Sequence, residues 1–199
     1  MPRPVGLLLG WVVVCCVASL IGAADFWIWL FELALGLVAI GALALTWKRL
    51  RFTNVAYFMA GLHFFVLALG ARYTYAEVPI TEWLKDALDL GRNHFDRVGH
   101  FFQGLVPAVF AREVLIRASG MKRGALLFVI VSSICLAFSA LYEILETLVV
   151  ILFYPDSGPE WLGWQGDVWD AQWDMTCALV GSIVAQLVIG PLQDRELRS

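Results

Sequence analysis

Two acidic residues lie inside a long apolar stretch of this 199-residue chain, and they are the first candidates for chemistry. Glu143 and Glu146 are three residues apart between Gly124 and Tyr154, so a helix places both carboxylates on one side. An ionised carboxylate in apolar surroundings is costly unless a specific partner compensates its charge. This pair therefore predicts a functional site more strongly than the other acidic residues do.

Two further sets of polar residues have the spacing of three and four that places side chains on one helical face. These sets are Asp96, His100 and Gln103, and, if a helix begins near Asp167, also Asp167, Asp170 and Asp174. His63 lies within another apolar stretch. Counting the helical rise from the ends of these stretches predicts one polar cluster at a similar height. Its members are His63, Asp96, His100, Glu143, Glu146, Asp170 and Asp174.

Several carboxylates that lie close together in an apolar environment repel one another, so their charge must be compensated. A divalent metal held by carboxylate oxygen and imidazole nitrogen, such as Mg, Mn, Zn or Fe, is one solution. Protonation with internal hydrogen bonds is a second solution. Pairing with Arg72, Arg92 or Arg97 is a third. The sequence leaves all three open, so the cofactor is unknown, with a divalent metal as the candidate.

Each candidate role has its own set of residues. The expected metal ligands are His100, Glu143, Asp170 and Asp174. The expected acid and base groups are Glu143, Glu146, His100 and Asp96. The residues expected to bind the phosphate of a substrate or cofactor are Arg92 and Arg97.

Several of these residues also have simpler explanations. Asp96, Asp167 and Asp170 suit the first turn of a helix, where carboxylates cap free amides and complement the helix dipole. The two arginines near Asp96 suit interfacial anchors, and His63 suits a packing residue that makes an interhelical hydrogen bond. These explanations do not extend to Asp174 or to the glutamate pair.

The composition excludes a soluble protein. Hydrophobic residues make up 60% of the chain and charged residues 16%, against about half and a quarter in soluble domains. The net charge is -3 and no basic run is present, so nucleic-acid binding is excluded. The four cysteines lie in apolar stretches without the spacing of a zinc site.

Six stretches are long enough to cross a membrane, since a span needs about 20 mostly apolar residues. We expect them at residues 4–24, 26–47, 52–71, 96–115, 124–154 and 173–193. The stretch 96–115 is the most polar of the six. The first stretch also resembles a signal peptide, but its apolar run is longer than the roughly 7 to 15 residues typical of one. The sequence thus predicts an all-α helical bundle that forms a single membrane domain over residues 1–199.

The distribution of basic residues predicts the orientation. Ten of the fourteen Lys and Arg fall at the termini and after the second and fourth spans, so both termini are expected in the cytoplasm. Most tryptophans then lie near the outer interface. The loop before the fourth span contains Thr81 to Leu90, whose apolar residues share one face and predict a short helix on the membrane surface. The polar cluster is expected in the outer half.

Three motifs resemble those of the YjdF-type family of bacterial inner-membrane proteins. They are GRNHFDRVGHFFQG at 91–104, LYEILE at 141–146 and QGDVWDAQWDM at 165–175. The resemblance implies a multi-pass protein of the inner membrane but no particular activity. A fainter similarity to VanZ-like membrane proteins involves an Asp-basic-x-x-His motif, matched by Asp96, Arg97 and His100, with Glu146 and Asp174 in place of the expected amides. These two acids make the site more acidic than the VanZ-like pattern.

Three functions are compatible with these observations. The first is an enzyme, with or without a metal, that acts on a lipid or lipid-linked substrate from the outer leaflet. The second is a proton-coupled transporter of a small solute, although the sequence has no inverted repeat. The third is a non-catalytic envelope protein whose polar cluster fixes helix packing. Membrane lipids are the expected partners, and the oligomeric state is open.

Overall fold

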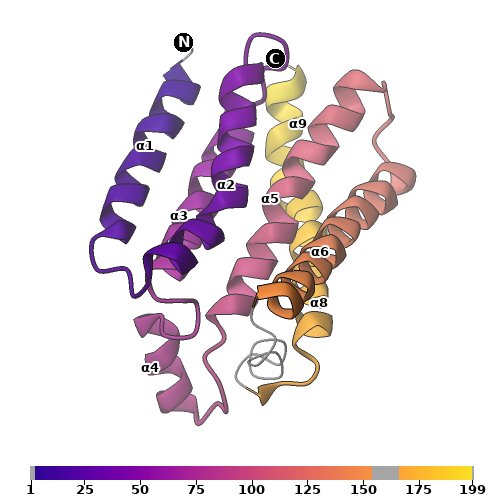
Figure 1. The fold of residues 1–199 in the computed structure, drawn as a ribbon. Coiled ribbons are helices and arrows are strands. Elements are labelled where there is room, and N and C mark those ends of the chain that lie inside the picture. The colour runs from indigo at the N-terminus through magenta and orange to yellow at the C-terminus, as the bar shows by residue number, and fades with distance from the viewer. Residues whose placement is uncertain (1–2, 154–165, 199) are drawn as a thin grey trace. The chain divides into compact units, whose positions relative to one another are not determined.

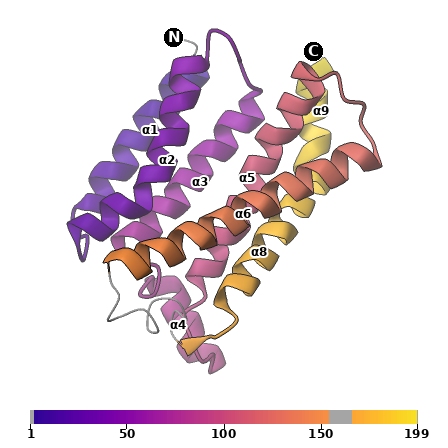
Figure 2. The same ribbon diagram turned by 45° about the vertical axis from the view of Figure 1, so that its right-hand side comes forward.

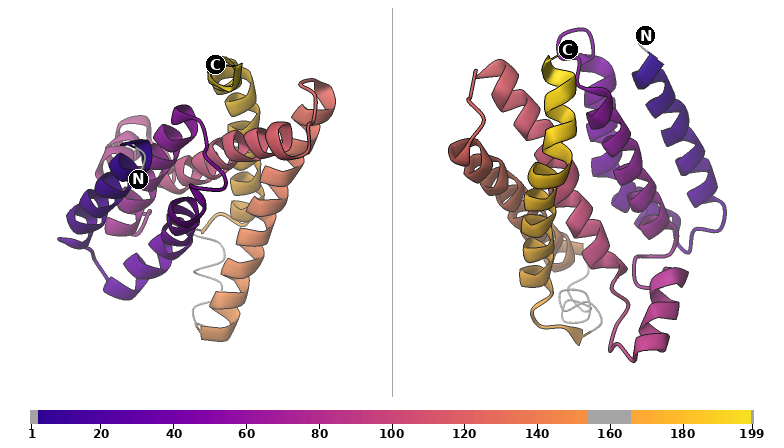
Figure 3. Two further views of the ribbon diagram at one scale, coloured as in Figure 1. Left: turned by 90° about the horizontal axis from the view of Figure 1, so that it is seen from above. Right: turned by 180° about the vertical axis from the view of Figure 1, so that it is seen from behind.

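The computed structural model describes residues 3–153 and 166–198, and all regular structure in these ranges is helical (Figure 1). The helices are α1 Arg3–Leu20, α2 Phe26–Thr46, α3 Asn54–Arg72, α4 Pro79–Leu88, α5 Phe95–Ala118, α6 Ala125–Phe153, α8 Asp170–Val184, the π-helix η3 Ala185–Ile189 and α9 Gly190–Arg198. The helices α8, η3 and α9 follow one another without a break (Figure 3). The predicted all-helical fold is confirmed for the described residues.

Five described helical segments are long and apolar enough to cross a membrane: α1, α2, α3, α6 and the continuous α8–η3–α9. They coincide with five of the six expected spans. The remaining expected span, residues 96–115, is the helix α5, which has 24 residues. Polar residues within it, such as His100, Gln103 and Glu113, keep it out of that apolar group. The six-span count and the cytoplasmic termini stay predictions.

The chain divides into two compact units, and the boundaries fall within α5 and η3. Unit 1 contains Met1–Gly99 and Val188–Ser199, and unit 2 contains His100–Leu187. Both are helical. The expectation of a single domain over the whole chain stays a prediction.

In unit 1, α3 packs against both α1 and α2 (Figure 1). Small residues on α3 allow the close approach: the indole Nε1 of Trp11 donates to the Gly61 carbonyl at 3.0 Å. The first turn of α3 is capped twice. Thr53 accepts from the Ala56 amide at 3.3 Å, and the Glu196 carboxylate of α9 accepts from the Asn54 amide at 2.7 Å. These bonds satisfy amides that a helix start leaves free.

The short helix α4 in unit 1 confirms the helix expected at Thr81 to Leu90, shifted two residues toward the N-terminus. Proline at its first position and Asp89 in the left-handed conformation after its last residue set these ends. Its apolar side chains Ile80, Trp83 and Leu88 are exposed. The helix therefore has an uncovered apolar face, as a surface-lying membrane helix requires.

In unit 2, α8 packs against α6 and α5 (Figure 2). The backbones of α5 and α8 touch at two glycines. A Cβ atom on Gly104 would overlap the Ala178 carbonyl, and one on Gly181 would overlap the Phe101 carbonyl. His100 lies near Asp174, and Gly104, one turn further along α5, lies against Ala178, one turn further along α8. The two helices therefore run in the same direction (Figure 1). Small residues allow this backbone contact between membrane helices.

Replacing Gly104 by alanine is expected to destabilise unit 2. The new methyl group must push α8 away from α5, and such overpacking costs about 1–3 kcal/mol. The thermal unfolding midpoint of the purified protein in detergent should fall. Gly41→Ala is the matched control because no heavy atom lies within 4 Å of its Cβ position. That variant should keep or gain up to about 1 kcal/mol from helix propensity. Equal midpoints for the two variants would contradict the close contact.

Candidate functional site in unit 2

The imidazole of His100 lies between two carboxylates that come from two other helices. The Nδ1 atom of His100 lies 3.5 Å from Glu143 Oε1 on α6, and its Nε2 atom lies 4.0 Å from Asp174 Oδ2 on α8. The three side chains are 7%, 12% and 3% exposed, respectively. Three of the residues expected to form a polar cluster are thus brought together inside unit 2.

The charge of this cluster needs compensation. Two carboxylates on opposite sides of one ring attract positive charge, either a protonated imidazolium or a bound cation. The ring of Tyr142 stands edge-on to the His100 ring, with centroids 5.7 Å apart. This contact restricts rotation of the imidazole. The ring therefore presents one nitrogen to Glu143 and the other to Asp174.

On α8, the structure corrects the expectation that Asp167 shares a helical face with Asp170 and Asp174. The helix begins at Asp170, and the Asp167 carboxylate accepts from the Trp169 amide at 3.0 Å in the turn before it. Asp167 thus stabilises the turn before α8 and does not cap the helix. Asp170 and Asp174 remain one turn apart, and both are buried.

The other expected members of the cluster lie on α6, α3 and α5. Glu146 is half-buried one turn beyond Glu143 on α6. His63 belongs to α3 in unit 1. Asp96 precedes His100 by one turn on α5, so helix geometry alone places the two on the same face. Their expected roles stay predictions.

The segment before α5, in unit 1, is fixed by the fully buried Asn93. Its side-chain oxygen accepts from the Phe95 amide at 3.0 Å, and its amide nitrogen donates to Glu82 Oε2 at 3.0 Å and to the Val78 carbonyl at 3.3 Å. Lys85 pairs with the same glutamate. Hydrogen bonds from Lys85 and then from Asn93 lower the pKa of Glu82. The start of α5 is therefore tied to α4.

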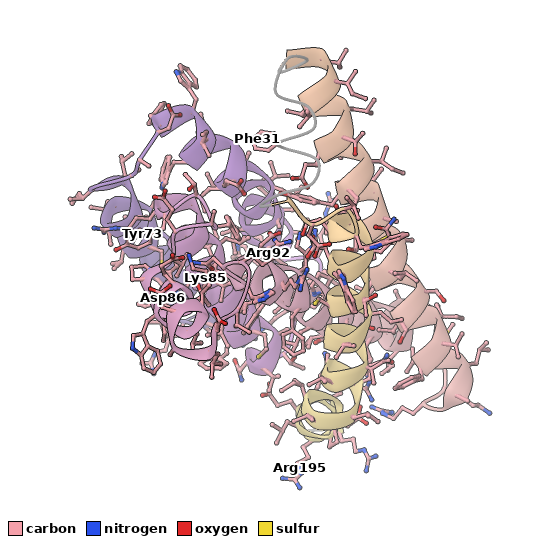
Figure 4. All side chains as sticks on the ribbon, turned by 90° about the horizontal axis from the view of Figure 1, so that it is seen from below. Phe31, Tyr73, Lys85, Asp86, Arg92 and Arg195 are labelled. Carbon is pink, nitrogen blue, oxygen red and sulfur yellow. The ribbon has the colours of Figure 1, made fainter. Side chains whose placement is uncertain are left out.

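The two arginines expected to bind phosphate flank this segment. Arg92, labelled in Figure 4 with Lys85 and Asp86 of α4, is buried, and its Nη2 atom lies 3.9 Å from Asp96 Oδ2. Arg97 Nη1 lies 3.2 Å from His94 Nδ1. Asp96 lies within the first turn of α5 and pairs with the residue four positions before it. Pairing with arginine, one of the three forms of compensation, thus occurs at Asp96.

Sequence reasoning missed Tyr75 in unit 1. Thr74 and Tyr75 both have left-handed backbone angles, with φ of 53° and 58°, which is strained for residues with a Cβ atom. A Cβ on Gly70 would overlap the Tyr75 ring, and one on Gly99 would lie 3.0 Å from it. Burial raises the pKa of Tyr75, and the charges of Glu32 and Asp96 raise it further. The only sequence signal for this buried tyrosine was the pair of glycines, Gly70 and Gly99, that leave room for its ring.

Comparisons with known proteins cover almost the whole chain. The model of a family described as Predicted membrane protein (DUF2238) matches residues 5–195. Inner membrane protein YjdF of Escherichia coli (strain K12) is 37% identical over 178 residues, which is 89% of this chain and 85% of that protein. No solved structure matches the chain.

Replacing Asn93 by alanine should destabilise the start of α5. The variant loses two donated bonds and one accepted bond of a fully buried side chain, and unsatisfied buried groups cost about 1–3 kcal/mol. Chemical or thermal unfolding of the purified protein measures the loss. Asn54→Ala is the control, because the Asn54 side chain is exposed, and it should stay within about 0.5 kcal/mol of wild type. An unchanged Asn93→Ala protein would show that the three bonds contribute nothing.

Proposed function

The chain belongs to the DUF2238 family of predicted membrane proteins, and from this premise we propose that this inner-membrane protein binds a divalent metal ion at His100 and Asp174. The resemblance of its three motifs to the YjdF-type family is confirmed. The location in the inner membrane is supported by the name of the E. coli relative and by the five apolar helices. The similarity to VanZ-like proteins stays a prediction.

The proposed topology has six spans with both termini in the cytoplasm. The helix α5 supports the sixth span, since its 24 residues reach about 36 Å, against about 30 Å of hydrocarbon. Its charged residues concentrate at its two ends, where a span meets water. The exposed apolar face of α4 then lies on the outer membrane surface.

The separation of His100 Nε2 from Asp174 Oδ2 is the observation that carries the metal proposal. At 4.0 Å it is too long for a hydrogen bond, and it is about 0.6 Å longer than the roughly 3.4 Å between two ligands of a tetrahedral ion such as zinc. A small movement of either side chain would therefore let both bind one ion. Asp170, buried one turn before Asp174, supplies a further carboxylate on the same helix. This donor set of imidazole and carboxylate suits Zn, Mn or Fe.

In this proposal Glu143 is not a metal ligand, although the sequence predicted it to be one. It faces Nδ1, the ring nitrogen turned away from Asp174. Metal-binding histidines commonly direct their second nitrogen to a carboxylate, which fixes the ring and makes the imidazole a better ligand. We assign Glu143 as the positioning residue for His100.

The activity we propose for this site is chemistry on a lipid or lipid-linked substrate. A divalent metal activates water or polarises a phosphoryl oxygen. Glu146 and Asp96 remain the proposed acid and base groups, and Arg92 and Arg97 the proposed phosphate ligands. Exposed Trp169 and Trp173 near the start of α8 suit a membrane interface, where a lipid headgroup would approach.

A second candidate function, proton-coupled transport, has one supporting observation. Polar contacts continue along unit 2 beyond the His100 site: the Gln186 amide in η3 donates to Ser132 Oγ at 3.0 Å and to the Phe128 carbonyl at 3.2 Å. A π-helix in a membrane span is often associated with function. The third candidate, packing alone, requires no bound ion.

Metal analysis of the purified protein tests the proposal. Wild type loaded with Zn²⁺ or Mn²⁺ and then desalted should retain about one ion per chain by elemental mass spectrometry. His100→Ala and Asp174→Asn should lose the ion. Glu143→Gln should retain it with an affinity lowered about 10–100-fold, because only the orientation of His100 is affected.

The control for this measurement is Asp89→Asn, at the exposed left-handed position after α4, which asparagine also tolerates. It should bind metal as wild type does. Retention of the same metal content by Asp174→Asn would refute a ligand role for Asp174. The packing function would then account for the cluster.

The lipid activity is tested separately in cells. A strain that lacks the gene should show a changed pattern of envelope lipids or lipid-linked intermediates by mass spectrometry. Wild type should restore the pattern, and His100→Ala, expressed at the same level in the membrane, should not. Identical lipid patterns in the deletion strain and its parent would contradict the enzymatic function while leaving the metal site standing.

A further inference from the structure

Gln103 and Ser139 in unit 2 each have a buried polar atom with no hydrogen-bond partner among the residues that the structure describes. These atoms are the side-chain oxygen Oε1 of Gln103 on α5 and the hydroxyl oxygen of Ser139 on α6. Gln103 is 8% exposed and Ser139 is 0% exposed. Buried polar groups in proteins are almost always satisfied, so each such atom indicates a partner that is not among the described residues.

Both residues extend the His100 site by one helical turn. Gln103 follows His100 by three residues, next to Gly104, where α5 touches α8. Ser139 precedes Glu143 by four residues and follows Ser132, which bonds Gln186, by seven. Positions 132, 139 and 143 therefore share the face of α6 that contacts the other helices of unit 2. Since α6 runs opposite to α5, the two orphan atoms lie on the same side of the His100–Glu143 pair.

Ser139 differs from four other hydroxyls in the described helices. Hydroxyls in helices commonly satisfy themselves by donating to a carbonyl three or four residues before them. Ser19, Thr46, Thr176 and Ser182 each do so. Ser139, fully buried, has no such bond. Its hydroxyl is thus available to a ligand.

We propose that Gln103 and Ser139 form a hydroxyl-binding subsite that continues the His100 site inward. The carboxamide oxygen of Gln103 accepts a hydrogen bond, and the hydroxyl of Ser139 both donates and accepts. A neutral O–H group satisfies both atoms without bringing further charge next to Glu143 and Asp174. The source of this hydroxyl is water or the glycerol headgroup of a lipid. The subsite does not require the proposed metal.

Thiol accessibility tests the subsite. Ser139→Cys is made in a background with all four native cysteines replaced by alanine and is placed in phosphatidylcholine nanodiscs with EDTA. A charged, water-soluble methanethiosulfonate reagent reacts with the thiolate, which forms only where water reaches the sulfur. We expect Ser139→Cys to react at least about tenfold faster than Ser133→Cys. Ser133 is the matched control, because it is exposed on the same helix but would face lipid.

Nanodiscs containing phosphatidylglycerol identify the source of the hydroxyl. Slower labelling of Ser139→Cys in these nanodiscs means that the lipid headgroup occupies the subsite, and equal labelling means that water does. Gln103→Cys provides a second reading if Ser139→Cys fails to fold. The proposal is overturned if the folded variant, Ser139→Cys or Gln103→Cys, is labelled as slowly as Ser133→Cys. Because EDTA is present throughout, this result is independent of the metal analysis.

Discussion

The close contact of α5 with α8 sets the geometry on which the site depends. Gly104 follows His100 by one turn on α5, and Ala178 follows Asp174 by one turn on α8. Because the backbones touch at Gly104 and Ala178, the preceding turns are brought near each other, and His100 Nε2 lies 4.0 Å from Asp174 Oδ2. A side chain at this contact would separate the helices and the two polar groups together.

The polar groups at this contact are buried, so their charges must be compensated within the protein. A carboxylate at the surface is compensated by water, whereas Asp174 is 2% exposed and must be compensated by neighbours. His100 provides one such neighbour, and Glu143 holds the opposite side of its ring at 3.5 Å. An ionisable group is costly in these surroundings, and apolar residues of similar volume would pack the helices equally well. This is the physical reason for proposing a bound cation.

Much of the fold could be predicted because membrane thickness dictates helix length. Residues 26–47, for example, had to form one helix, and α2 spans Phe26–Thr46. The site was harder to predict. Helical spacing could not separate Glu143 from Glu146, which share a side of α6, since only packing determines which of them meets His100. The start of α8 at Asp170 depends on a turn bond of Asp167. Ser139 carried no signal, because a serine in an apolar helix usually bonds its own backbone.

The most direct test of the central claim is a crystal structure of the zinc-loaded protein with anomalous data collected at the zinc edge. We predict an anomalous peak about 2.0–2.1 Å from His100 Nε2 and about 2.0–2.2 Å from an Asp174 oxygen. Glu143 should remain on the Nδ1 side of the ring. A structure with no peak there, in which the Asp174 carboxylate accepts a hydrogen bond directly from His100, would contradict the metal site.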